Sequence, residues 1–185
     1  GPVVFSNRLE KFCPTPLVKN IKGDFILVED SNEKDLTKSF GRLNVFHGQM
    51  GMFVRAMSYM LSHGADGLKQ VSEDAVLNAN YLRASLSSHL TPAFDGFCMH
   101  EILFSDDFLK DTGVETLDFA KAMIDEGYHP MTIYFPLVIH GALLVEPTET
   151  ESKQSLDHFI NTLCDLVERL KKDSDSFKAA PYLHQ

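Results

Sequence analysis

Three glutamates crowd one short stretch of the sequence, Glu146–Ser152. The stretch follows the apolar run Ala142–Val145, which is typical of a short buried strand, and it precedes a segment with helical spacing of apolar residues. Open α/β sheets tend to place their ligand sites at such strand ends. Carboxylates are groups that bind substrates and transfer protons, so the stretch resembles half of an active site.

A structural interpretation explains part of the same stretch. Thr148 is predicted to cap a helix over residues 149–172, and Glu151, three residues on, is predicted to close a capping box. The helix dipole favours Glu149 and Glu151 in the first turn. Glu146 lies outside that turn, so the structural interpretation does not account for it.

Three of the eight histidines, His100, His129 and His140, lie next to predicted strand ends. Each one alone is better explained as a structural histidine, but together with Glu146 they would form a polar cluster if the strand ends share a cleft. The sequence has no His-x-x-x-His pair, no Gly-rich phosphate loop and no Gly-x-Ser-x-Gly elbow. The residues therefore predict no metal site and no complete catalytic constellation.

The elements that must position these residues follow from hydrophobic periodicity. It predicts a hairpin over 17–29, helices over 43–62, 67–90, 116–126 and 149–172, and strands over 100–105, 131–135 and 137–145. This order predicts a mixed α/β fold, specifically an α+β two-layer sandwich, with helices against one face of a small, mostly antiparallel sheet. The predicted domains are an N-terminal linker and β-hairpin (1–40), an α/β C-terminal small domain (41–172) and a loosely held tail (173–185).

Two details of the predicted helices bear on the site. Gly64 suits the end of the first helix, whose apolar residues are expected to form a core face. Asn78 and Asn80 interrupt the second helix, and because helix interiors disfavour asparagine, they indicate a capped or polar-networked face.

Composition excludes several classes of function. The net charge of −9, from 26 acidic and 17 basic residues, argues against a nucleic-acid or anionic-membrane surface. No apolar run reaches the ~18 residues that a membrane helix needs. Three widely spaced cysteines without a Cys-x-x-Cys pair indicate a reducing, intracellular compartment. The chain starts without methionine, and we expect a fragment or processed piece.

Four motifs together resemble one known family. They are Val76–Leu82, Cys98–Glu101, Tyr128–Thr132 and Leu144–Ser152. In this order and at these intervals they resemble the C-terminal region of the glycine cleavage system P-protein, glycine dehydrogenase (decarboxylating), most closely subunit 2 of the two-subunit bacterial form. The likeness covers almost the whole chain, and it implies the small C-terminal domain of an aminotransferase-like, fold-type I enzyme that uses pyridoxal 5'-phosphate.

The resemblance also implies a reaction and a set of partners. Such enzymes, oxidoreductases of glycine catabolism, decarboxylate glycine and pass its aminomethyl group to the lipoyl arm of H-protein, with release of CO2. Implied partners are the chain's own upstream domain that binds pyridoxal phosphate, P-protein subunit 1, lipoylated H-protein and glycine, in the bacterial cytoplasm. The family's Schiff-base lysine lies in a His-Lys-Thr motif, which this sequence lacks. We therefore expect an inactive fragment with no catalytic residue, bound cofactor or metal.

Six residues are assigned by motif to the substrate and cofactor cleft: first His129, Thr132, Glu146 and Thr148, then His100 and Glu101. Their expected roles are positioning and the entrance for the lipoyl arm, not covalent chemistry. The alternative function is a non-catalytic binding or interaction module derived from the same domain. The small domain of an ordinary aminotransferase is disfavoured, because the strand at 142–145 carries no arginine to clamp a substrate carboxylate.

Overall fold

The computed structural model describes residues 3–29, 38–43, 45 and 48–182. The chain divides into two compact units, Gly1–Tyr59 and Met60–Gln185. The domain boundary was predicted at residue 41. The division between the units instead falls within helix α1 (Met50–Leu86), which begins in the first unit and ends in the second.

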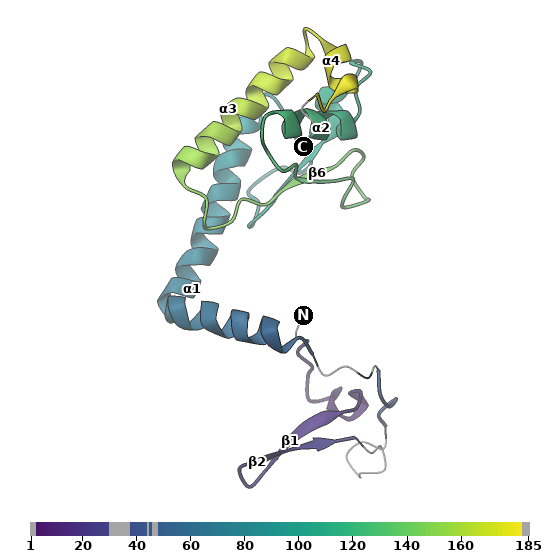
Figure 1. The fold of residues 1–185 in the computed structure, drawn as a ribbon, viewed down its shortest axis with the longest axis vertical. Coiled ribbons are helices and arrows are strands. Elements are labelled where there is room, and N and C mark those ends of the chain that lie inside the picture. Colours follow the sequence, from purple (N-terminus) through teal and green to yellow (C-terminus); the bar gives the residue numbers. More distant parts are fainter. Residues whose placement is uncertain (1–2, 30–37, 44, 46–47, 183–185) are drawn as a thin grey trace. The chain divides into compact units, whose positions relative to one another are not determined.

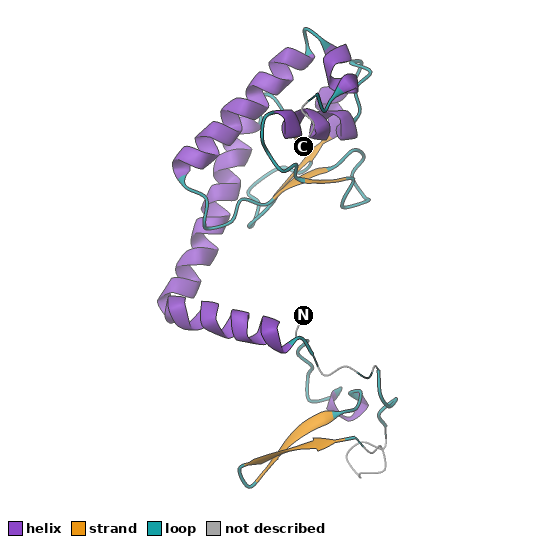
Figure 2. Ribbon diagram, in the orientation of Figure 1, coloured by secondary structure: helices purple, strands orange, loops and turns teal. Residues whose placement is uncertain are grey.

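The first unit contains the predicted hairpin. A 3-10 helix, η1 (Glu10–Phe12), precedes the antiparallel strands β1 (Leu17–Ile21) and β2 (Asp24–Val28), which are drawn as arrows in Figure 2. Lys22 and Gly23 join the strands, both with positive φ, at 56° and 101°. A two-residue turn of this kind matches the twist of the strands, so the prediction over 17–29 is confirmed. Residues 30–37 of the predicted linker lie outside the described residues.

Helix α1 merges the two helices predicted before and after Gly64. Gly64 has non-helical torsion angles (φ 64°, ψ −174°), which glycine adopts without a steric penalty. The helix begins at Met50, and residues 44, 46 and 47 of the segment predicted to be helical from 43 lie outside the described residues. Every residue from 50 to 66 is exposed, so this chain does not bury the predicted core face.

A four-stranded sheet forms the centre of the second unit. Its order is β3 (Thr91–Pro92), β4 (Ile102–Ser105), β6 (Leu143–Val145) and β5 (Thr132–Ile133), and all neighbours are antiparallel. The predicted strands at 100–105 and 131–135 are present in shorter form. The strand predicted over 137–145 is wrong in its first half, since residues 137–141 form turns before β6.

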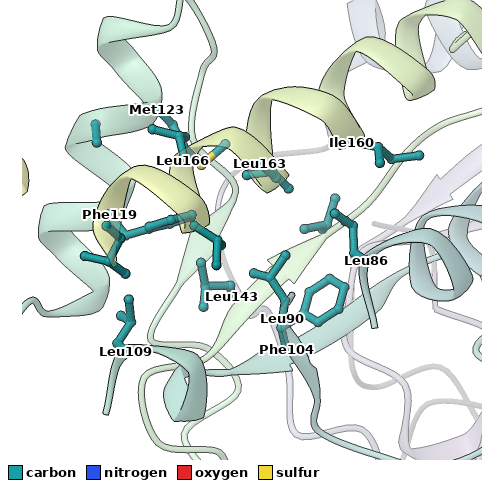
Figure 3. Close-up of a cluster of buried hydrophobic side chains, with 14 of the residues drawn as sticks. Leu86, Leu90, Phe104, Leu109, Phe119, Met123, Leu143, Ile160, Leu163 and Leu166 are labelled. Atoms are coloured by element: carbon teal, nitrogen blue, oxygen red, sulfur yellow. The ribbon is translucent and has the colours of Figure 1, made fainter. Parts of the chain in front are cut away.

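One face of this sheet carries the core. Ile102 pairs with Val145 and Phe104 with Leu143, and these four side chains are buried. They pack with side chains of α1, α2 (Thr116–Asp125), α3 (Lys153–Leu170) and α4 (Ser174–Ala179), many of which Figure 3 draws together. The predicted two-layer arrangement of sheet and helices is thus confirmed. Among the described helices, none is long and apolar enough to cross a membrane.

Helix α3 lies beside the C-terminal part of α1, where Tyr81 donates a hydrogen bond to Asp157 (Figure 1). It begins at Lys153, and its cap is Ser152, whose hydroxyl accepts from the Ser155 N–H at 3.1 Å. The capping box predicted for Thr148 and Glu151 is therefore wrong. The main chain of both residues is held instead by Asn78, which leaves residues 148–151 as a turn before the helix.

The C-terminal segment differs from the expected loosely held tail. Residues 174–179 form α4, capped by Asp173, whose carboxylate accepts from the Ser176 N–H at 3.3 Å. Phe177 on this helix is 1% exposed, and its ring stacks on that of Phe119 at a centroid distance of 6.1 Å. The segment is thus part of the core; residues 183–185 lie outside the described residues.

Candidate functional site

The end of β6 is where the predicted site residues meet. Because β6 runs antiparallel to both neighbours, the starts of β4 and β5 lie beside its C-terminal end. His100 comes two residues before β4 and His129 three residues before β5, whereas Glu146 directly follows β6. The register of the sheet therefore brings three residues that are distant in the sequence to one edge of the fold.

A cavity of about 590 Å³ opens at this edge. His129, Thr132 and Glu146, three of the predicted residues, line it. The rest of its wall comes from the 128–132 loop, the end of β6 and the turn after it, the start of α3 and Leu82 of α1, and includes Tyr128, Glu151, Ser155, His158 and Phe159. The cavity combines aromatic rings with two carboxylates and two imidazoles, which suits a small ligand held by a few polar contacts.

A second hollow of about 390 Å³ adjoins the first. Its lining includes His100, Thr148 and again Glu146, together with apolar residues of α1. The His100 Nε2 atom lies 3.7 Å from the Glu146 Oε1 atom, and the two side chains are 55% and 58% exposed. Glu146 and its neighbour Pro147 line both hollows, and of the two only Glu146 has a charged side chain.

Two residues of the predicted cluster lie elsewhere. Glu101 is half-buried and lines neither hollow. His140 lines a separate hollow of about 290 Å³, where its Nδ1 is 2.7 Å from Asp106 Oδ2. The reason is that His140 precedes β6 whereas Glu146 follows it, so the strand separates them. The structure therefore brings His100 and His129 to Glu146, but not His140.

Hydrogen bonding defines the nitrogen that His129 presents. Its Nδ1 lies 3.0 Å from the Pro130 carbonyl oxygen, which only accepts hydrogen bonds. In the neutral imidazole Nδ1 therefore carries the proton, and Nε2 is the acceptor. His129 can thus accept a proton or a hydrogen bond from a ligand through Nε2.

Two residues that contact the site loops were noticed in the sequence only as helix interruptions. The Asn80 side chain accepts from the Cys98 N–H at 3.1 Å and donates to the Cys98 carbonyl at 2.7 Å. The Asn78 side chain donates to the Thr148 carbonyl at 3.0 Å. The signal for these contacts was the presence of asparagine in a helix interior, where it is disfavoured.

Among the described residues, this edge presents neither an activated thiol nor a set of metal ligands. Burial raises the pKa of the Cys98 thiol, and its backbone hydrogen bond only partly offsets the effect. The thiol is therefore a poor nucleophile at neutral pH. In the part of the chain that the structure describes, no group of three or more His, Cys, Asp or Glu side chains is arranged to hold a metal ion.

Comparisons with known proteins agree with one another. The sequence model of a family described as "Glycine dehydrogenase, C-terminal domain" matches residues 71–181. Two curated relatives, from Caulobacter vibrioides and Kosmotoga olearia, are 60% and 46% identical over 98% of this chain, and both are named "Probable glycine dehydrogenase (decarboxylating) subunit 2". The chain covers only 35% and 37% of their length, about a third.

A solved structure shares the fold. It is described as the crystal structure of glycine decarboxylase (P-protein) of the glycine cleavage system, in inhibitor-bound form. The TM-score is 0.66 over 86% of this chain and 37% of that chain, with 19% sequence identity. At this identity the likeness establishes the fold alone.

Proposed function

Because this chain belongs to the family of glycine dehydrogenase C-terminal domains, as its four motifs predicted, we propose that it forms the positioning half of a glycine decarboxylase active site. The observation that carries the proposal is the placement of Glu146 between His100 and His129 at one strand end. The proposed reaction of the longer protein is decarboxylation of glycine, with transfer of the aminomethyl group to the lipoyl arm of H-protein.

The residues of this edge do not fit covalent binding of pyridoxal phosphate. Neither lysine nor arginine is among the described residues that line the two hollows, so a Schiff base or a phosphate ion pair has no partner there. Lys153, at the start of α3, donates to Asp157 at 2.7 Å, and this contact raises the pKa of Lys153, which keeps it charged. We therefore propose that the longer protein holds the cofactor outside this chain.

Within this proposal the site residues bind and orient. Glu146 and His129 would accept hydrogen bonds from glycine or from the aminomethyl group carried by the lipoyl arm, and Thr132 and Thr148 would add hydroxyl contacts at the two hollows. Orientation of this kind accounts for large rate factors, because a misplacement of about 1 Å costs on the order of 100-fold in rate. Glu101 lines neither hollow, so its assigned role has the weakest structural support.

The N-terminal part of α1 supports the proposal of a partner domain. Its large exposed apolar residues are Met50, Met52, Phe53, Val54, Met57, Tyr59, Met60 and Leu61. A helix with a wide apolar face normally buries that face against another element, and large exposed apolar patches mark interaction sites. We propose that this helix packs on the upstream domain of the longer protein, which would also bind a subunit 1 and H-protein in the bacterial cytoplasm.

Alanine substitutions in the longer protein test the site assignment. For His129→Ala and Glu146→Ala we expect the exchange of the glycine carboxyl carbon with CO2 to fall about 100-fold, with unchanged content of pyridoxal phosphate. Glu73→Ala is the control, because the Glu73 side chain is exposed and pairs with Lys69 at 3.5 Å, a type of pair that contributes little. The assignment is wrong if both site variants keep normal exchange and normal H-protein binding.

Borohydride trapping on the chain itself tests where the cofactor is held. When the purified chain is mixed with pyridoxal phosphate and reduced with borohydride, we expect only scattered modification of exposed lysines. The physical reason is that, among the described residues, no lysine lines either of the two hollows at the site edge. Peptide mapping after reduction is the measurement, and the longer protein is the positive control. Stoichiometric labelling of a single lysine in this chain would contradict the proposal.

A further inference from the structure

We propose that Asn78 and Asn80 are positioning residues that hold the loops of His100 and Glu146 at the separation where these two side chains meet. The contacts to both loops come from a single turn of helix α1. The consequence for catalysis rests on the proposed function, whereas the effect on the loops does not.

Asn80 holds the loop of His100. Its amide oxygen accepts from the Cys98 N–H at 3.1 Å, and its amide nitrogen donates to the Cys98 carbonyl at 2.7 Å. This reciprocal pair fixes both polar groups of one residue, as a neighbouring strand would. The same nitrogen donates to the Val76 carbonyl at 2.8 Å, which ties the side chain to its own helix. Cys98 lies two residues before His100, so the clamp acts close to the imidazole.

Asn78 holds the loop of Glu146. Its amide nitrogen donates to the Thr148 carbonyl at 3.0 Å and to the Glu151 carbonyl at 3.4 Å. Thr148 lies two residues after Glu146, just as Cys98 lies two residues before His100. Side chains two positions apart leave a helix in different directions, about 200° around the axis. One turn of α1 can therefore reach two loops.

Exposure leaves the side chains of His100 and Glu146 without support from packing. Both His100 and Glu146 are more than half exposed, and their polar atoms are 3.7 Å apart. Packing does not hold two such side chains in one arrangement, and an exposed ion pair contributes little by itself. The separation of the pair therefore depends on the main chains that carry it, and these are what the two asparagines bind.

Hydrogen exchange in the 185-residue chain tests the clamp directly. In Asn80→Ala we expect protection of the Cys98 amide to fall on the order of tenfold, since its acceptor is lost, and contacts between His100 and Glu146 in NMR spectra to disappear. Asn78→Ala should likewise loosen the 148–151 turn. Amides of β4 and β6 should keep their protection, which separates a local effect from unfolding. Asn161→Ala replaces an exposed asparagine of α3 and is the matched control, in which protection of the Cys98 amide should not change.

A conservative variant and a kinetic measurement complete the test. Asn80→Asp keeps the acceptor for the Cys98 N–H but loses the donor, so protection of that amide should fall less than in Asn80→Ala. In the longer protein, Asn80→Ala should lower kcat for carboxyl exchange with little change in cofactor content. Unchanged Cys98 protection and an unchanged His100–Glu146 contact in Asn80→Ala would overturn the clamp. Normal kinetics with a loosened loop would overturn only its catalytic consequence, and the His129→Ala and Glu146→Ala variants judge the proposed function separately.

Discussion

Replacing Phe177 with alanine is expected to destabilise the second unit by about 3–5 kcal/mol, the usual range for a fully buried phenylalanine. The side chain is 1% exposed and stacks on Phe119 at 6.1 Å. Its removal leaves a cavity in the core and takes away an aromatic contact. Since domains are only marginally stable, this loss would remove much of the free energy of unfolding. Urea denaturation followed by circular dichroism measures it.

Tyr182→Ala provides the control within the same C-terminal segment. The Tyr182 side chain is 59% exposed, and its contact with Asp125 is made by the main-chain N–H at 2.9 Å, which alanine keeps. We expect a change within about 0.5 kcal/mol, as for ordinary surface substitutions. Similar midpoints for Phe177→Ala and the unmodified chain would show that α4 does not belong to the cooperative core.

Gly141→Ala is expected to destabilise the same unit by about 2–4 kcal/mol, from backbone strain and overpacking together. Gly141 is buried in the turn before β6 with φ 54°, a conformation that alanine rarely adopts. An added Cβ would also overlap the carboxyl group of Asp106. That carboxylate contacts His140 Nδ1 at 2.7 Å, so relief of the overlap would break this pair. Thermal and urea unfolding give the size of the effect.

Gly96→Ala separates the two causes. Gly96 also has a positive φ, 85°, but nothing lies within 4 Å of the position of an added Cβ. This variant should therefore lose only the strain contribution, about 1 kcal/mol. Equal losses for the two glycine variants would show that the overlap with Asp106 is relieved without cost.

The fold and part of the site follow from local sequence patterns. Helix and strand periods placed the hairpin, α2, α3 and the three main strands, and residues next to strand ends supplied His100, His129 and Glu146. Their convergence depends on strand register, which a single sequence does not encode in any local pattern. His140 illustrates this limit, because it is as close to a strand as the others but lies at the opposite end of β6.

Three differences from the sequence predictions arise from tertiary contacts. Thr148 and Ser152 are both good capping residues, and the choice between them depends on Asn78, about 70 residues away, which holds the Thr148 carbonyl. Phe177 stands in a polar segment without periodicity, so the sequence did not indicate that it inserts into the core. The exposed apolar face of the N-terminal part of α1 is a third case, since a helical pattern of apolar residues does not indicate which surface covers it.

The sharing of Glu146 between the two hollows constrains how such a site can diverge. Any substitution at this position alters both hollows at once, so a change that suits a new ligand in one hollow disturbs the other. Independent adaptation must use residues that belong to a single hollow, such as His129 on one side and His100 on the other. In a protein lineage we therefore expect Glu146 to change later than either histidine, and libraries for altered specificity should vary the histidines first.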